Sequence, residues 1–281
     1  MATEHDINKL AALFAGARRI TCLSGAGMST ESGIPDYRSS KGLYNTLTSE
    51  QVFDIARFRR QPELFYSVIG PLYLSILKAQ PNAGHVALAQ LADRFGKELV
   101  IATQNIDGLH QKAGSRVVHE VHGTMDTLSC QDCGSQALAE SFLNELGEGE
   151  VLRHSCGGVF KPDITFFGEQ LPAAAFSASL DAMADADLVL VLGTSLQVHP
   201  AASLPDARRD GCPLLIVNRT PTAMDDKADM VFHDSIGELL PQVLAQMDHG
   251  AQPGSQRGQR SDYHSALFNN NPTHLQRKND L

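Results

Sequence analysis

The sequence lacks tryptophan altogether, and only 6% of its 281 residues are aromatic, so a core built from it must be mainly aliphatic. Basic residues are also few, with 23 lysines and arginines against 32 aspartates and glutamates. The resulting net charge of −9 argues against direct binding of duplex nucleic acid, which needs a basic face to neutralise phosphates. The charge is compatible with a site for basic peptide segments and equally with an ordinary solvated surface.

Long apolar segments are missing as well. No run approaches the about 20 residues that a membrane-spanning helix requires, and residues 1–6 have neither the positive nor the apolar part of a secretory signal. We therefore expect a cytoplasmic protein with no membrane association. Its five cysteines are an odd number, and in a reducing compartment metal binding or burial is favoured over disulfide bonds.

Strand and helix patterns alternate along most of the chain. Short apolar runs typical of buried strands occupy residues 19–23, 98–103, 117–121, 188–192, 214–217 and 230–232. Apolar residues at helical spacing occupy residues 4–16, 82–95, 172–184 and 236–247. This alternation predicts an α/β fold, with a Rossmann-like parallel sheet that carries helices on both faces.

Two stretches interrupt the alternation and are interpreted as insertions. Residues 45–76 are helical and rich in aromatic residues, with expected breaks at Pro62 and Pro71. Residues 127–160 hold three of the cysteines around a short helical piece near 138–146, and we interpret them as a small module.

These interruptions define the expected domain organisation. One domain covers residues 1–248, and its α/β core comprises residues 1–44, 77–126 and 161–248. Residues 249–281 are polar and rich in glycine, glutamine and asparagine, a composition that predicts disorder.

A glycine-rich turn follows the first expected strand. Gly25 and Gly27 let the backbone approach an anion closely, as in turns that bind the phosphates of dinucleotides. However, Thr30 stands where the dinucleotide fingerprint has its third glycine, and no acidic residue follows at the end of a second strand to hold a ribose. Together with the helical insertion, these departures argue against a dehydrogenase.

Polar or glycine-containing loops also follow three further expected strands, at residues 104–107, 193–195 and 218–220. The carboxyl ends of parallel strands meet at one edge of a sheet, where open α/β folds bind ligands. Four such loops make a rim long enough for a dinucleotide.

The motifs at these positions, taken in order, resemble those of the sirtuins, the NAD-dependent protein deacylases, and of their bacterial and archaeal members in particular. They are Gly25-Ala-Gly-x-Ser-x-x-Ser-Gly-Ile-Pro-Asp-Tyr-Arg38, Thr103-Gln-Asn-Ile-Asp-x-Leu-His110, His122-Gly123, the cysteine module, Phe166-Phe-Gly-Glu169, Gly193-Thr-Ser-Leu-x-Val198 and Val217-Asn218. The resemblance covers about residues 10–245. It implies that residues 1–248 form a sirtuin-type catalytic domain.

The resemblance also implies an activity, which is NAD-dependent removal of acyl groups, acetyl first of all, from lysines of proteins or peptides. The enzyme would cleave NAD, release nicotinamide and transfer the acyl group to ADP-ribose. His122 would be the general base, because a neutral imidazole with an ordinary pKa of about 6.5 can take a proton near pH 7. Asn105 and Asp107 would complete the catalytic set.

Ligand-binding roles follow from the same resemblance. NAD would be bound by Gly25, Ala26, Gly27, Ser29, Thr30, Asp36, Tyr37, Arg38, Gln104, Asn105, Ile106, Asp107, Gly193, Thr194, Ser195, Asn218, Arg219 and Ile236. The peptide would pair as a strand with the main chain of two loops. Its binding residues, with those of the acyl group, would be Tyr66, Ile69, Phe167, Gly168, Glu169 and Val198.

One position narrows the range of acyl groups that we expect the enzyme to accept. Some relatives use an arginine three residues after the equivalent of Tyr66 to bind negatively charged acyl groups, but this chain has Ile69 there. A dicarboxylic acyl group would bury an unpaired charge. Acetyl or a longer neutral acyl group is therefore predicted.

The cysteine module departs from the family pattern. Sirtuins hold structural zinc with two Cys-x-x-Cys pairs, a closed tetrahedral site. Cys130, Cys133 and Cys156 are present, but Arg153 occupies the expected position of the fourth cysteine. We expect structural zinc with the three cysteines as ligands and with His154 and His119 as candidates for the fourth, and a metal-free module is the alternative. Cys22 and Cys212, in or beside core strands, are expected to be inert apolar residues.

Two other functions stay open at this point. An NAD-dependent protein ADP-ribosyltransferase would need nearly the same cofactor residues, so the sequence discriminates poorly against it. A non-catalytic NAD-binding sensor would not need His122, whereas the chain has His122, Asn105 and Asp107 together.

Overall fold

A computed structural model describes residues 1–35, 49–143 and 150–250. The chain divides into two compact units, Met1–Gly250 and Ala251–Leu281, and the second lies outside the described residues. Among the described residues, no helix is both long enough and apolar enough to cross a membrane.

The described residues form a six-stranded parallel sheet, which confirms the predicted fold class. Its strands are β1 (Arg19–Ser24), β2 (Glu98–Thr103), β3 (Val118–Glu120), β7 (Leu188–Leu192), β8 (Leu214–Val217) and β9 (Met230–Phe232). They lie in the order β3-β2-β1-β7-β8-β9. This is the order of a dinucleotide-binding fold, and its direction reverses between β1 and β7, where such folds bind ligands.

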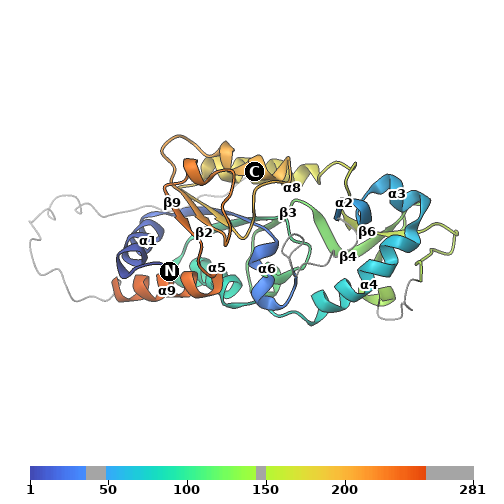
Figure 1. The fold of residues 1–281 in the computed structure, drawn as a ribbon, viewed down its shortest axis with the longest axis horizontal. Coiled ribbons are helices and arrows are strands. Elements are labelled where there is room, and N and C mark those ends of the chain that lie inside the picture. The colour runs from blue at the N-terminus through green and yellow to red at the C-terminus, as the bar shows by residue number, and fades with distance from the viewer. Residues whose placement is uncertain (36–48, 144–149, 251–281) are drawn as a thin grey trace, which may run out of the picture. The chain divides into compact units, whose positions relative to one another are not determined.

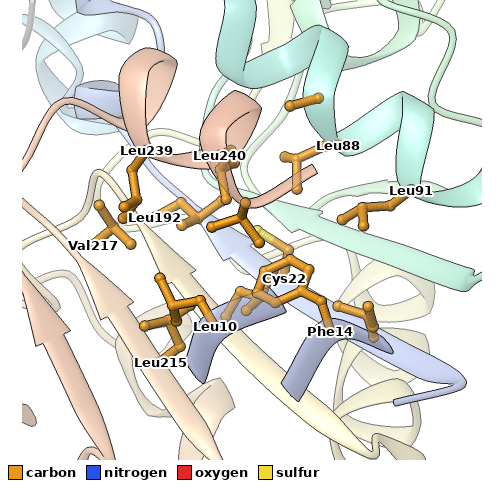
Figure 2. Close-up of a cluster of buried hydrophobic side chains, with 14 of the residues drawn as sticks. Leu10, Phe14, Cys22, Leu88, Leu91, Leu192, Leu215, Val217, Leu239 and Leu240 are labelled. Carbon is orange, nitrogen blue, oxygen red and sulfur yellow. The ribbon is translucent and has the colours of Figure 1, made fainter. Parts of the chain in front are cut away.

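Helices cover both faces of this sheet (Figure 1). One face packs against three helices, α1 (Glu4–Gly16), α5 (Ala83–Phe95) and α9 (Ile236–Gly250). The other packs against α8 (Ala173–Asp185) and a short 3-10 helix, η3 (Ala201–Ala207). Successive strand residues point to opposite faces, so Cys22 lies in the first core and Leu23 in the second. Figure 2 shows Cys22 among leucines from β-strands and helices, as expected for an apolar residue.

The two insertions share one hydrophobic core and form what we call the small lobe. It contains helices α2 (Ser49–Val52), α3 (Ile55–Arg60), α4 (Pro62–Lys78) and α7 (Glu140–Leu143), and strands β4 (Gly123–Cys130), β5 (Gln136–Leu138) and β6 (Phe160–Ile164). The strands make an antiparallel sheet in the order β5-β4-β6. Phe58, Phe65 and Phe166 meet at its centre, with ring centroids 5.2–5.5 Å apart.

The observed boundaries differ from those expected in two respects. The antiparallel sheet begins at Gly123 and ends at Ile164, so it extends beyond the 127–160 module into residues assigned to the core. Helix α4 also continues through Pro71, where a break was predicted. Apolar positions continue at helical spacing on both sides, from Ile69 to Tyr73, and their burial in the small lobe offsets the hydrogen bond that proline cannot make.

A close backbone contact joins the turn that follows β1 with the end of β7 and the turn after it. Gly25 N donates to Leu192 O (3.0 Å), and Gly27 N donates to Gly193 O (2.8 Å). A Cβ atom on Gly193 would lie 2.2 Å from Met28 N, and one on Gly27 would lie 2.9 Å from the Gly193 Cα. Only glycine at both positions lets the two turns meet at this distance.

We expect Gly193→Ala to destabilise the protein more than an alanine at another left-handed glycine. Gly193 and Gly211 both have positive φ, +62° and +76°, and a left-handed backbone costs an alanine about 1–2 kcal/mol at either position. The collision with Met28 N adds overpacking strain, typically about 1–3 kcal/mol, whereas nothing lies within 4 Å of a Cβ on Gly211. Urea unfolding of both variants measures the difference, and equal losses would contradict the close packing of the turns.

Candidate active site

Loops from three strand ends are joined by hydrogen bonds at the carboxyl edge of the parallel sheet. The side chain of Asn105, after β2, donates to Gly25 O (3.0 Å) in the turn after β1. Gln104 Nε2 donates to Thr194 Oγ1 (3.0 Å) in the turn after β7. The structure thus brings together the rim that the sequence predicts.

The fourth loop, after β8, closes on itself and on the glycine turn. Asn218 Nδ2 donates to Thr220 O (2.7 Å), which fixes this loop. Arg219 lies 3.6 Å from Glu31, and Glu31 also accepts a hydrogen bond from Ser235 Oγ (2.8 Å) at the start of α9. Glu31 therefore connects the glycine turn with two later segments of the chain.

A directional chain of hydrogen bonds fixes the polar wall of the site. Asn105 Nδ2 donates to Ser29 Oγ (3.1 Å), and Ser29 Oγ donates to Asp107 Oδ2 (2.6 Å). The other carboxylate oxygen of Asp107 accepts from Leu109 N (2.9 Å). Asn105, Ser29 and Asp107 are all buried, and a buried network satisfied in this way is rigid.

His122 follows β3, beside this wall. Its Nδ1 lies 3.1 Å from Gln104 O, and because a carbonyl oxygen can only accept, Nδ1 carries the proton and Nε2 keeps its lone pair. Desolvation by burial lowers the pKa of His122, although the hydrogen bond to Gln104 opposes part of that shift. The imidazole is therefore neutral at pH 7, with Nε2 able to accept a proton.

Two histidines that the sequence analysis did not assign to the site lie buried beneath the rim, His85 and His110. Their ring centroids are 4.8 Å apart. Ser24 Oγ donates to Thr103 Oγ1 (2.9 Å), so its 2.8 Å contact with His110 Nε2 requires that nitrogen to be the donor. Desolvation by burial lowers the pKa of His85 to about 4 and that of His110 to about 3, so both are neutral at pH 7.

His85 also belongs to the start of helix α5. Asn82 caps the helix, and its N–H donates to His85 Nδ1 (3.4 Å) in a capping box. The Asn82 side chain donates to Met28 O (2.7 Å), which ties the start of the helix to the glycine turn. The three-residue spacing from Asn82 to His85 is a sequence signal for the capping box, and the contact with Met28 has no such local signal.

The segment expected to bind a peptide lies beside α3. Phe167 N donates to Phe53 O (2.7 Å), Ile55 N donates to Phe167 O (3.1 Å), and the Phe167 side chain is 41% exposed. Gly168 follows with a φ of +90°. This segment thus has one main-chain edge paired inside the small lobe and an exposed aromatic side chain.

Three cysteines and one histidine meet at the far end of β4. The ligand atoms of Cys130, Cys133, His154 and Cys156 all lie within 4.8 Å of one another. Cys133 Sγ lies 3.3 Å from His154 Nδ1, and Cys130 Sγ lies 3.6 Å from Cys156 Sγ. A hydrogen bond with Ser135 lowers the pKa of the Cys133 thiol to about 6, which favours the thiolate that metals bind.

This donor set fits zinc, which takes four thiolate or imidazole ligands in a tetrahedron. Arg153, at the expected fourth position, donates instead to Gly157 O (3.2 Å). His119 lies on β3 and contacts Ser179 Oγ (3.2 Å), so it is not part of the cluster. Of the two histidine candidates, the structure therefore selects His154.

A model of the Sir2 family matches residues 25–200. The chain belongs to the Sir2 family. It is 41% identical over 246 residues to an NAD-dependent protein deacetylase of Clostridium perfringens, covering 86% of this chain and 99% of that protein. It is 42% identical over 256 residues to an NAD-dependent protein deacetylase of Chromobacterium violaceum, covering 87% and 99%. A solved Sir2 structure with a deacetylated p53 peptide and 3′-O-acetyl ADP-ribose matches with a TM-score of 0.80 at 37% identity, covering 85% and 98%.

Several residues that the Sir2 resemblance assigns to ligands have other surroundings here. Tyr66 and Ile69 lie inside the core of the small lobe, where the Tyr66 hydroxyl donates to Phe160 O (2.6 Å). Ile236 is likewise buried in the sheet core. Asp36, Tyr37 and Arg38 lie outside the described residues. The roles of these residues in binding stay predictions.

The remaining assigned residues lie in the expected turns. Ala26 and Thr30 begin two 3-10 turns, and Thr30 Oγ1 donates to Gly27 O (3.0 Å). Ile106 packs on the core of the small lobe. Val198 lies in the second of the two loops that are expected to bind the peptide. Its carbonyl oxygen accepts from Ala202 N (2.9 Å) at the start of η3.

The two buried histidines predict a loss of stability in acid. In the unfolded chain both titrate near 6.5, but burial keeps their folded pKa near 4 and 3. Below pH 6.5 the unfolded state therefore binds protons that the folded state does not, so stability falls as pH falls towards 4. Each histidine contributes a slope of up to about 1.4 kcal/mol per pH unit.

Urea unfolding between pH 7 and pH 4.5 measures this slope. We expect His110→Gln to make it shallower, while His5→Gln, at an exposed position of α1, leaves it unchanged. An unchanged slope in His110→Gln would show that other titratable groups cause the loss of stability in acid.

The cysteine cluster predicts one zinc ion per chain with His154 as its fourth ligand. Substitutions outside the ligand shell commonly cost about 10–100-fold in metal affinity, so His154→Ala should weaken zinc binding by more than that. Arg153→Ala is the matched control and should keep full zinc content. Elemental analysis after dialysis against a graded series of chelators gives the comparison, and equal retention by both variants would exclude His154 as a ligand.

Proposed function

We propose that this chain is an NAD-dependent protein-lysine deacylase, acting first of all as a deacetylase, with His122 as its general base. The observation that carries the proposal is the double role of Gln104. Its backbone carbonyl holds His122 in the tautomer with a free Nε2, while its side chain bonds Thr194 on the rim. Gln104 thereby connects His122, the proposed base, to the edge of the sheet that suits a dinucleotide.

The rim residues fit NAD as the second substrate. NAD supplies the ADP-ribose that receives the acyl group, and nicotinamide is the leaving group. The N–H groups of Gly25 and Gly27 donate to Leu192 O and Gly193 O. The contribution of these two glycines is therefore to bring the two turns together. Asn105 and Asp107, fixed through Ser29, would line the nicotinamide and ribose side of the pocket.

The role of His122 follows from its protonation state. Burial keeps the ring neutral at pH 7, and the bond from Nδ1 to Gln104 directs the lone pair of Nε2 away from the backbone. Nε2 would take the proton of a ribose hydroxyl, which makes that oxygen a nucleophile towards the acyl carbon. The hydrogen bond to Gln104 O holds this tautomer until Nε2 takes the proton, and it continues to hold the ring afterwards.

The acyl-lysine substrate would add as a strand between residues 167–169 and residues 196–199. Main-chain pairing gives affinity with little sequence selectivity, so proteins or peptides with different sequences are suitable partners. No cation stands at Ile69, which is buried among apolar side chains, so a neutral acyl group is favoured.

Zinc held by Cys130, Cys133, His154 and Cys156 would have a structural role in the small lobe. Cysteines that hold zinc must stay reduced, which suits the reducing cytoplasm.

The decisive experiment combines the protein, NAD and an acetyl-lysine peptide, with the products identified by mass. We expect deacetylated peptide, with its lysine side chain free, nicotinamide and O-acetyl-ADP-ribose in equal amounts. In His122→Ala, kcat/KM should fall by about 10²–10⁴-fold, as for loss of a general base, while NAD binding stays within twofold.

The control variant is His119→Gln, three residues earlier on β3, whose side chain contacts Ser179 on α8. It should keep wild-type kcat/KM. Full deacetylation by His122→Ala would overturn the assigned base. Transfer of ADP-ribose to protein without release of free lysine would instead favour an ADP-ribosyltransferase.

A further inference from the structure

A lysine buried in the small lobe has no role in the reaction described so far. Lys161 lies on β6 and is 5% exposed. Its ammonium group donates to Pro162 O (3.1 Å) and Ile164 O (2.8 Å) and lies 3.0 Å from Glu169 Oε2. Three N–H groups meet three oxygens, so the charge is fully satisfied in a place where an unpaired ammonium would be very unfavourable.

The same ammonium group also lies over an aromatic ring. Lys161 Nζ is 4.3 Å from the centroid of Phe166, which is itself held edge-on by Phe53 and Phe58 at 5.7 and 5.5 Å. A cation over a desolvated ring is attracted by its π electrons. Residues 161–169 therefore fold back around the ammonium group of Lys161, an arrangement that we call the fold-back.

This fold-back determines the course of the chain through residues 167–169. Glu169 Oε2 accepts both from Lys161 and from Phe166 N (2.8 Å), and Glu169 N donates to Phe166 O (3.0 Å). Phe167 and Gly168 lie between these two closures, with Gly168 at φ +90°. The turn that carries the exposed Phe167 is thus connected to Lys161 through Glu169, beside the bonds of Phe167 to Phe53 and Ile55.

The other end of the fold-back reaches the base. The peptide group between Ile164 and Thr165 accepts from Lys161 Nζ on its carbonyl side. On its amide side, Thr165 N donates to His122 O (2.7 Å). One peptide group therefore lies between the buried lysine and the backbone of His122.

We infer that Lys161 is a positioning residue that holds the peptide-binding segment 167–169 in register with His122. The inference rests on the proposed deacylase function. Without the ammonium group, Glu169 and two carbonyl oxygens lose their donor. The 166–169 turn then keeps its bonds to Phe53 and Ile55 but loses its connection through Lys161 to the peptide group beside His122. Because NAD binds at the rim of the parallel sheet, this loss affects the peptide more than NAD.

The test is the split between two Michaelis constants in Lys161→Met, which keeps the length of the side chain and removes its charge. Loss of about 1.4 kcal/mol, the low end for a hydrogen bond to a charged group, corresponds to about tenfold. We therefore expect KM for an acetyl-lysine peptide to rise about tenfold and KM for NAD to stay within twofold. Lys161→Arg, which keeps a multiple donor, should recover at least half of this loss on a logarithmic scale.

The matched control is Lys97→Met. Lys97 Nζ also donates to two backbone carbonyls, Ala15 O (2.8 Å) and Ala17 O (2.6 Å), but it lies before β2, at the opposite edge of the sheet from the site. This variant should destabilise the protein without changing either KM. All assays are run well below the melting temperature of each variant.

The outcomes separate the two proposals. If the wild type fails to deacetylate any peptide, the proposed function fails; if the wild type is active and Lys161→Met keeps its peptide KM, only the positioning role fails. An equal rise in both Michaelis constants would likewise overturn the inference. Should Lys161→Met not fold, Glu169→Gln removes the charge partner alone, and an unchanged peptide KM in that variant would contradict the role.

Discussion

The contact between the turns after β1 and β7 is the constraint on which the rest of the structure depends. Backbone meets backbone there, through Gly27 N and Gly193 O at 2.8 Å, with no space for a Cβ atom on either glycine. The contact lies where the strand order reverses, so it determines how the strand ends approach one another. Once the turns are locked, Asn105 reaches Gly25 and Gln104 reaches Thr194 at hydrogen-bonding distance. The glycines thus build the rim by close packing, and the polar residues beside them are placed as a consequence.

The parallel sheet and its rim could be predicted because the signals for them are local. Apolar runs mark each strand, and the loops of an α/β sheet that follow strand ends gather at one edge whatever the intervening sequence. The single core shared by both insertions could not be predicted. Phe65 and Phe166 are far apart in the chain, and the spacing of apolar residues does not show which segments pack against each other. His154 also needed the structure, since Arg153 and His154 are adjacent and only the fold shows which one faces the cysteines.

Buried histidines illustrate the same limit in a different way. His85 and His110 occur in the sequence as an ordinary helix-capping residue and the end of a loop motif, with 24 residues between them. The fold brings their rings to a centroid distance of 4.8 Å, tilted by 59°, and removes water. This desolvation, rather than any neighbouring charge, is the main reason that both stay neutral. In the described part of the chain, His85 Nε2 and His110 Nδ1 remain buried without a partner. Buried polar atoms without partners cost stability, so the fold, and not hydrogen bonding at these atoms, holds the two rings in place.

Strands β4 and β6 run from the cysteine cluster to the neighbourhood of His122, the proposed general base. At one end of their ladder, Cys130 pairs with Phe160, beside the cysteine cluster. At the other end, Gly123 pairs with Ile164, next to His122 and the carbonyl that Lys161 holds. A Cβ on Gly123 would lie 2.1 Å from Asp163 O, so the strands cannot shift at this point without separating. The pairing register shifts between Gly123 and Leu128, so the ladder consists of two paired parts, one beside the cysteine cluster and one beside the proposed general base.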